Sequence, residues 1–112
     1  MAGEPGAEIP GVDKDLYMIF AGIEALRELA AEQDPPKANL RLSQTSARLY
    51  DFNIGWGVLM SGRLMRLEHY YRAEALTRGQ ERHYRELRSE LEEVTPKIEN
   101  LGLSRPTVPL ED

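Results

Sequence analysis

The most constraining feature of this sequence is a long stretch without proline, from Ser43 to Thr95. Within it the apolar residues recur every three or four positions, which is the spacing of one helix face and not the alternation of a strand. The large apolar residues of its first half form one stripe: Leu49, Phe52, Trp56, Met60, Leu64, Leu67 and Tyr71. This pattern predicts a helix with one strongly apolar face.

A second stripe lies on roughly the opposite side of the same predicted helix. It begins with Gly55, Gly62 and His69 and continues through Leu76, Tyr84, Leu87, Leu91 and Val94. Either one continuous helix carries two seams that different neighbours bury, or the helix breaks near Gly79 and restarts. Thr77 and Gln80 have the spacing of a capping box, which favours a restart. We nevertheless favour the continuous helix, because a packed helix tolerates one glycine.

The two glycines of the second stripe, Gly55 and Gly62, occupy positions where alanine would favour the helix more. They indicate either a neighbouring helix that packs closely or a ligand groove beside Trp56. We favour close packing and predict an oligomer interface on this side. The predicted interface residues are Gly55, Gly62, Leu87, Leu91 and Val94.

An earlier helix is predicted over residues 13–32. Its apolar residues alternate three and four apart: Leu16, Ile19, Ile23, Leu26 and Ala30. Pro35 and Pro36 then end the helix, and the short connection turns the chain back along it. The fold class predicted is all-α: a helical hairpin with a short first helix and a long second helix, completed to a four-helix bundle by dimerisation.

The chain divides into three parts. Residues 1–12 are rich in Gly, Pro, Ala and Glu and are predicted to be a disordered N-terminal segment. Residues 13–103 form a single helical domain, in which a short last helix starts at Thr95-Pro96 and stops at Gly102. Residues 104–112 form an extended C-terminal tail. Its Pro-x-x-Pro spacing is that of a groove-binding peptide, so a protein partner for the tail stays open.

Composition excludes several classes of protein. The chain has 112 residues and a net charge of −5, which argues against general nucleic-acid binding. No cysteine is present, so disulfides and thiolate metal sites are excluded. No apolar run is long enough to span a bilayer, and the N-terminus does not resemble a signal peptide. We therefore expect a cytoplasmic protein.

Catalytic and metal-binding patterns are sparse. The histidines are His69 and His83, and neither belongs to the Glu-x-x-His motif of a di-metal bundle. No serine lies in a nucleophile elbow, and no glycine-rich loop follows a strand. We expect no catalytic residues, no metal site and no cofactor, so the chain is interpreted as a non-enzyme.

Two sets of residues support the alternative functions. A ligand pocket could form near Trp56, with polar groups from Arg66, His69 and Tyr70. Three arginines share one helical face and could contact an anion such as phosphate: Arg78, Arg82 and Arg85.

The leading hypothesis is a non-enzymatic helical protein that self-associates, with a dimer favoured, in a structural, adaptor or regulatory role. Two apolar seams on one helix and a core too thin for one short chain motivate it. A small-molecule-binding bundle, which could be an enzyme, with its pocket near Trp56 and His69 is the alternative. Binding of nucleic acid or phosphate by the arginine face comes third.

Overall fold

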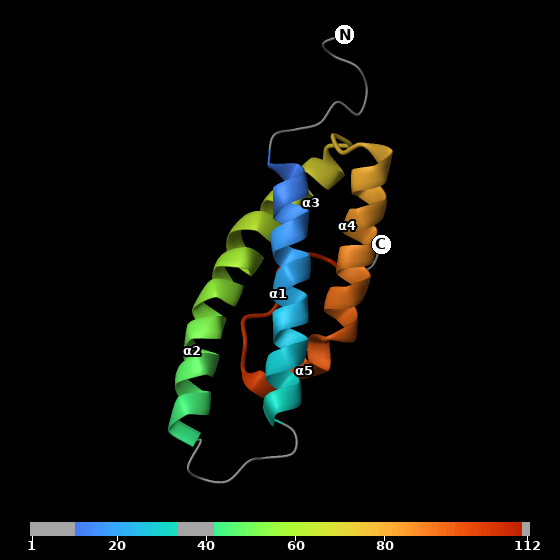
Figure 1. Ribbon diagram of the computed structural model, residues 1–112. Helices are drawn as coiled ribbons and strands as arrows, with labels where there is room; N and C mark the ends of the chain where they lie inside the picture. The colour runs from blue at the N-terminus through green and yellow to red at the C-terminus, as the bar shows by residue number, and fades with distance from the viewer. Residues whose placement is uncertain (1–10, 34–41, 111–112) are drawn as a thin grey trace.

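The computed structural model describes residues 11–33 and 42–110, with the side chains of residues 33 and 42–46 outside this description. The predicted disorder of residues 1–10 and the turn at Pro35-Pro36 therefore lie outside the described residues. Val12, predicted to belong to the disordered segment, instead begins the first helix and is fully buried in the core. The described elements are all helical: α1 (Val12–Gln33), α2 (Leu42–Val58), the π-helical turn η2 (Leu59–Arg63), α3 (Leu64–Arg72), α4 (Arg78–Glu93) and α5 (Thr95–Leu101). The prediction of an all-α fold is confirmed (Figure 1).

α2, η2 and α3 continue into one another as a single long helix. The residues at both joints keep right-handed helical backbone angles, and the Leu64 N–H donates to the Leu59 carbonyl across the wider π turn. Trp56, Met60 and Leu64 are all buried, although their steps of four exceed the period of an α-helix. The wider turn keeps these side chains on one face, as the first stripe of the sequence predicts.

The long helix ends at Arg72, well before the predicted end of the proline-free stretch. Glu74 takes a left-handed backbone angle, φ 56°, and interrupts the helical hydrogen bonds. The Thr77 hydroxyl then accepts from the Gln80 backbone N–H at 3.1 Å, and the Gln80 side chain accepts from the Thr77 N–H at 3.0 Å. The prediction of a continuous helix is therefore wrong, and the capping-box alternative is correct.

Because of this break, α4 turns back and packs beside α1 (Figure 1). α1 thus lies between the long helix on one side and α4 on the other. It buries Ile19, Ile23 and Leu26 completely, as the spacing of the first helix predicts. Three long helices of one chain therefore enclose a common core, where the sequence predicted a two-helix hairpin.

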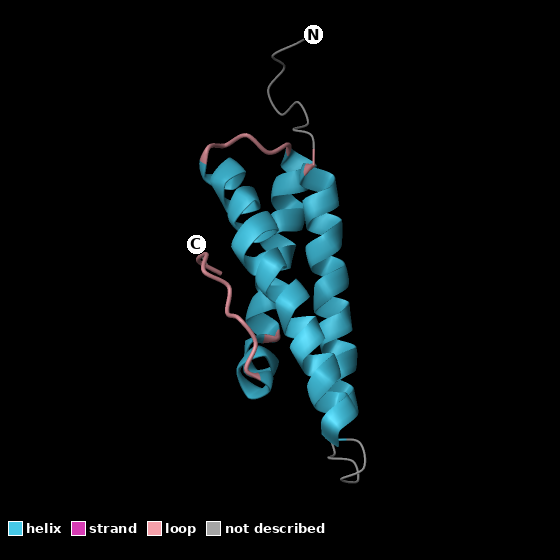
Figure 2. Ribbon diagram, turned by 90° about the vertical axis from the view of Figure 1, so that its left-hand side faces the viewer, coloured by secondary structure: helices cyan, strands magenta, loops and turns pink. Residues whose placement is uncertain are grey.

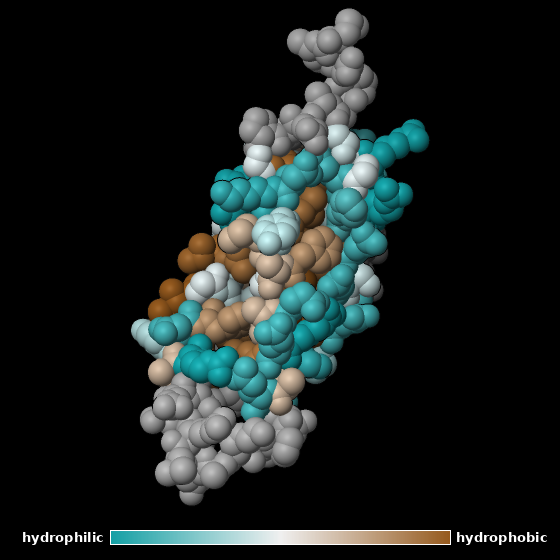
Figure 3. All heavy atoms as spheres, in the orientation of Figure 1, coloured by the Kyte–Doolittle hydropathy of each residue, from teal (hydrophilic) through white to brown (hydrophobic). Residues whose placement is uncertain are grey.

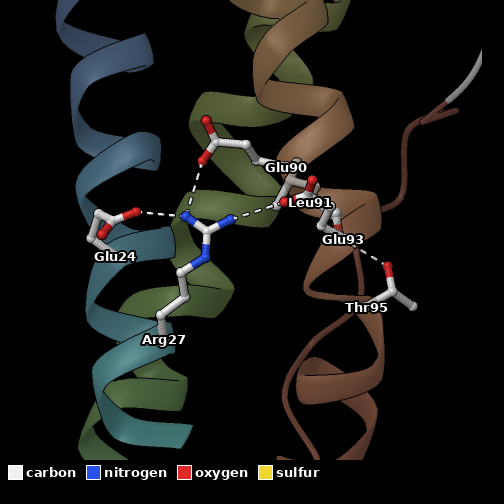
Figure 4. A network of polar contacts seen from close by, with 6 residues as sticks. All are labelled: Glu24, Arg27, Glu90, Leu91, Glu93 and Thr95. Atoms are coloured by element: carbon white, nitrogen blue, oxygen red, sulfur yellow. Dashed lines mark hydrogen bonds and ion pairs between the residues drawn. The ribbon is translucent and has the colours of Figure 1, made fainter. Parts of the chain in front are cut away.

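An ion-pair network ties α1 to the lower part of α4 (Figure 4). The Arg27 guanidinium on α1 donates to Glu24 of its own helix at 2.6 Å. It also donates to Glu90 and Glu93 of α4, both at 3.3 Å. Since these groups are largely exposed, the network fixes the pairing of the helices more than it adds stability.

The chain after α5 runs back along the bundle as an extended segment. Gly102 ends α5 in the left-handed region at φ 69°, as predicted for the stop of the last helix. Leu103 is buried, while Val108 and Leu110 pack against the core. Figure 2 shows this segment on the side of the bundle away from α1. We call residues 103–110 the tail strap.

Candidate functional site

The predicted interface residues of α4 lie in the interior of the chain itself. Leu87 and Leu91 are fully buried and Val94 is 2% exposed, because α4 folds back onto α1. They are therefore not available to a partner in this structure. The physical reason is the break after Arg72, which turns the second apolar stripe inward.

The predicted interface glycines lie on the outside. A Cβ atom added to Gly55 or to Gly62 would meet no atom within 4 Å, so no part of the described chain packs closely against either residue. The close approach in this bundle occurs instead at Gly22 of α1. A Cβ there would lie 2.7 Å from Leu59 Cδ1 and 3.6 Å from the Trp56 ring. Sequence reasoning missed Gly22.

The side chains of the four residues predicted for a ligand pocket lie in different environments. The Trp56 indole is buried and donates to the Ser104 carbonyl at 2.7 Å. Arg66 is bound to Asp15, whereas His69 is exposed and contacts the edge of Tyr70. Because these side chains do not converge, they form no common pocket. A shallow cleft lies elsewhere, between α1 and α2, where Glu28, Leu29 and Phe52 are among its lining residues.

Asp15 is a buried carboxylate on α1 that links this helix to the long helix. It accepts from Arg63 Nη1 at 2.7 Å, and from Arg66 Nε and Nη2 at 2.8 and 2.6 Å. Burial raises the pKa of the Asp15 carboxyl, but the hydrogen bonds and charges of Arg66 and Arg63 outweigh burial and lower it below its ordinary value. Asp15 is therefore a charged structural link.

A polar and aromatic cluster fills the space between α3 and α4. The Tyr84 hydroxyl donates to Glu68 at 2.5 Å, and burial followed by this bond raises the pKa of Tyr84 far above its usual range. The buried Arg88 guanidinium lies 4.7 Å from the Tyr71 ring centre and 5.2 Å from that of Tyr84. These contacts join α3 to α4 across the turn between the two helices.

The three arginines predicted for anion binding are all exposed on α4. Arg85 pairs with Glu81 at 3.6 Å and lies 3.4 Å from the Tyr71 hydroxyl. Arg78 stands at the first turn of α4, where the helix dipole favours anions, and Arg82 follows one turn later. This face is a solvated surface with one arginine already engaged by a neighbouring carboxylate.

An apolar surface remains uncovered on α1 and the long helix. Six large apolar side chains stay exposed among the described residues: Tyr17, Met18, Tyr50, Ile54, Val58 and Met65. All six lie on these two elements, and none lies on the described parts of α4, α5 or the tail strap. Figure 3 shows pale and brown side chains gathered over α1 and α2, with hydrophilic side chains around them.

The register of the helices places part of this surface in one continuous area. Met18 lies one turn from both Asp15 and Gly22, and these two residues contact the long helix. Gly55 and Met65 flank the row formed by Ile54, Val58 and Gly62. We call this surface the open face; it comprises Met18, Ile54, Gly55, Val58, Gly62 and Met65. Tyr17 lies one turn from Asp13, which bonds to Gln80 of α4 at 3.3 Å, and is therefore not part of it.

Comparison with known proteins finds no matching family model, and no curated protein or solved structure with significant similarity. Within the described residues, no group of three or more acidic, histidine or cysteine side chains is arranged to hold a metal ion. None of the described helices has the length and apolar content required to cross a membrane.

Proposed function

We propose that this chain is a non-enzymatic helical protein that self-associates through its open face, with a structural or regulatory role. The observation that carries this proposal is the confinement of the exposed large apolar side chains to α1 and the long helix. Contiguous apolar surface with a polar rim is typical of protein–protein interaction sites.

The row on the long helix runs parallel to the buried stripe. Ile54, Val58 and Gly62 follow one another at steps of four, as Trp56, Met60 and Leu64 do, because the wider π turn keeps this spacing on one face. This row is exposed on the outer side, whereas the stripe through Trp56 faces the core. A helix with both stripes can pack against its own chain and against a partner.

A second copy of this chain fits the row when the two long helices run antiparallel. Asp51 lies near one end of the long helix, and Arg72, which pairs with Glu68 at 2.5 Å, lies near the other. A two-fold axis near Ser61 would bring Asp51 of one copy towards Arg72 of its partner. Both copies would contribute α1 and the long helix, which gives a four-helix arrangement.

The area of the open face limits the expected affinity of the dimer. A helix from Leu42 to Arg72 is about 45 Å long, and a face about 10 Å wide offers roughly 450 Å² per copy. Stable interfaces bury about 800 Å² per partner. The contribution of Met18 reduces this deficit only slightly. We therefore expect a weak dimer, with a dissociation constant in the micromolar range.

Two variants test the proposal by light scattering. Val58→Asp places a charge in the centre of the row and should give a monomer of unchanged helix content. Gly62→Leu fits the isolated chain, since a side chain there has open space, but it should block the approach of a partner. Ser89→Asp, on the exposed side of α4, is the matched control.

The proposal predicts that both open-face variants shift the mass to that of a monomer, while the Ser89→Asp protein behaves like wild type. Wild-type mass in both open-face variants, at concentrations where wild type is a dimer, would overturn it.

A further inference from the structure

The tail strap occupies a groove whose construction is that of a peptide-binding site. One wall is α2, which contributes Asn53, Trp56 and Gly57, and the other is α4, which contributes Arg88. We call these four residues and the space between them the tail groove. Figure 2 shows the strap along this side of the bundle.

The tail groove forms hydrogen bonds with the main chain of its occupant. The Trp56 Nε1–H donates to the Ser104 carbonyl at 2.7 Å, and the Asn53 side-chain oxygen accepts from the Ser104 N–H at 3.2 Å. At the other end, Arg88 Nη1 donates to the Pro109 carbonyl at 3.4 Å. Trp56 is 1% exposed with the strap in place, so the Ser104 carbonyl is the partner of an N–H that the strap itself shields from water.

Apolar contacts complete the fit. Leu103 is buried, and Val108 and Leu110 pack against the core. A Cβ at Gly57 would lie 3.5 Å from the Ser104 hydroxyl, an ordinary van der Waals distance, so the strap passes close to α2 without requiring a glycine there. Pro106 and Pro109 restrict the strap to extended conformations, which lowers the entropy lost on docking.

We propose that the tail groove binds extended, proline-containing apolar peptides, and that its occupant in trans is the tail strap of a second copy. The strap begins directly after Gly102, at φ 69°, a residue that lets the backbone change direction on an exchange between copies. In the structure the strap also contacts α5, through the Leu103 N–H to the Ile98 carbonyl at 2.9 Å and the Arg105–Glu99 ion pair at 3.4 Å. In the isolated chain the covalently attached strap occupies the groove at high effective concentration.

Because Trp56 is the only tryptophan, its fluorescence reports on the groove directly. The probe is a synthetic peptide of residues 102–110 that carries a fluorescence quencher at its C-terminus. It is titrated into the full-length chain at 1 µM, roughly the low end of the expected association range. A peptide of the same composition in scrambled order is the control.

The attached strap competes with the peptide, so the decisive sample is the full chain with Val108→Asp, which weakens the strap without altering the groove. We expect saturable quenching in this variant at a peptide concentration at least about 10-fold lower than in wild type. Adding Asn53→Ala to the variant should weaken the quenching again. Helix content is measured by circular dichroism, and Leu110→Ser replaces Val108→Asp if that content falls.

Absence of saturable quenching in the strap variants at millimolar peptide would overturn the inference, as would equal quenching by the scrambled peptide. The same titration in a Val58→Asp background separates the two proposals. Quenching that persists in a monomeric protein supports the tail groove even where the open-face dimer fails.

Discussion

The two long sides of this bundle differ in what covers them. On the side away from α1, the tail strap fills the groove and supplies acceptors and donors to Trp56, Asn53 and Arg88. On the side formed by α1 and the long helix, Ile54 is 55% exposed and Val58 is 61% exposed. The chain thus covers one apolar surface with its own C-terminal residues and leaves a comparable surface open. The proposed partner site is the surface that the chain leaves open.

The shape of the molecule is consistent with this difference. The radius of gyration is 16.2 Å, whereas a compact domain of about 100 residues has roughly 13 Å. An elongated bundle has more surface for its volume, so three helices and one strap cannot shield every apolar side chain. Association along the long axis is the simplest way to shield the remaining ones.

The largest expected effect comes from comparing the loss of a side chain in the common core with the loss of one on the open face. Leu87→Ala deletes a fully buried side chain and should lower the free energy of unfolding by about 3 kcal/mol. Ile54→Ala, on the open face, should change it by less than about 0.5 kcal/mol in the monomer. Urea unfolding at submicromolar protein measures both. Equal losses would mean that the open face is covered within the single chain.

An intermediate effect is expected at the Asp15 link, which holds α1 against the long helix beside the open face. Asp15→Asn removes the charge that Arg63 and Arg66 bind, and should cost about 2 kcal/mol at neutral pH. The exposed Asp51→Asn is the control, with little expected change.

The pH dependence of this link follows from the lowered pKa of Asp15. The stabilisation is fully present above the unfolded-state pKa, about 3.9, and is lost as the pH falls through the lower folded-state value. Wild type should therefore lose more stability than Asp15→Asn between about pH 4 and pH 2, as followed by thermal unfolding. Parallel losses in the two proteins would show that Asp15 is not a charged link.

The smallest expected effect is a difference in stability between alanine substitutions at two glycines. Gly55→Ala should stabilise the monomer by up to about 1 kcal/mol, because alanine favours the helix and no atom opposes its Cβ. Gly22→Ala should stabilise less, or destabilise, because Leu59 must move to a costlier rotamer. Melting temperatures of dilute samples compare the two. A higher melting temperature for Gly22→Ala than for Gly55→Ala would contradict the assignment of the close approach to Gly22.

Local patterns in the sequence predict much of this fold. The apolar stripes of α1 and of the long helix, the stop at Gly102 and the all-α class follow from spacing and backbone chemistry alone. The capping box at Thr77 and Gln80 also predicts the start of a new helix, although we favoured a continuous helix. Glu74, which adopts the left-handed angle at the break, carries no sequence signal for that role.

Long-range contacts could not be predicted in the same way. Nothing near Asp15 in the sequence indicates Arg63 and Arg66, which approach it only when α1 packs against η2 and α3. Residues 104–112 were predicted only to be an extended tail, and their docking on Trp56 and Arg88 could not be predicted because these contacts join distant positions. One signal was available for the open face: the apolar residues Ile54 and Val58 and the glycine Gly62, four residues apart, lie off the predicted core stripe.

The mass of the wild-type chain as a function of its concentration tests the central claim most directly. Sedimentation equilibrium from about 1 µM to several hundred micromolar spans the range expected for a weak interface. The open face predicts a reversible change from monomer to dimer within this range. A monomer at every concentration would show that α1 and the long helix need no second copy, and would contradict the account.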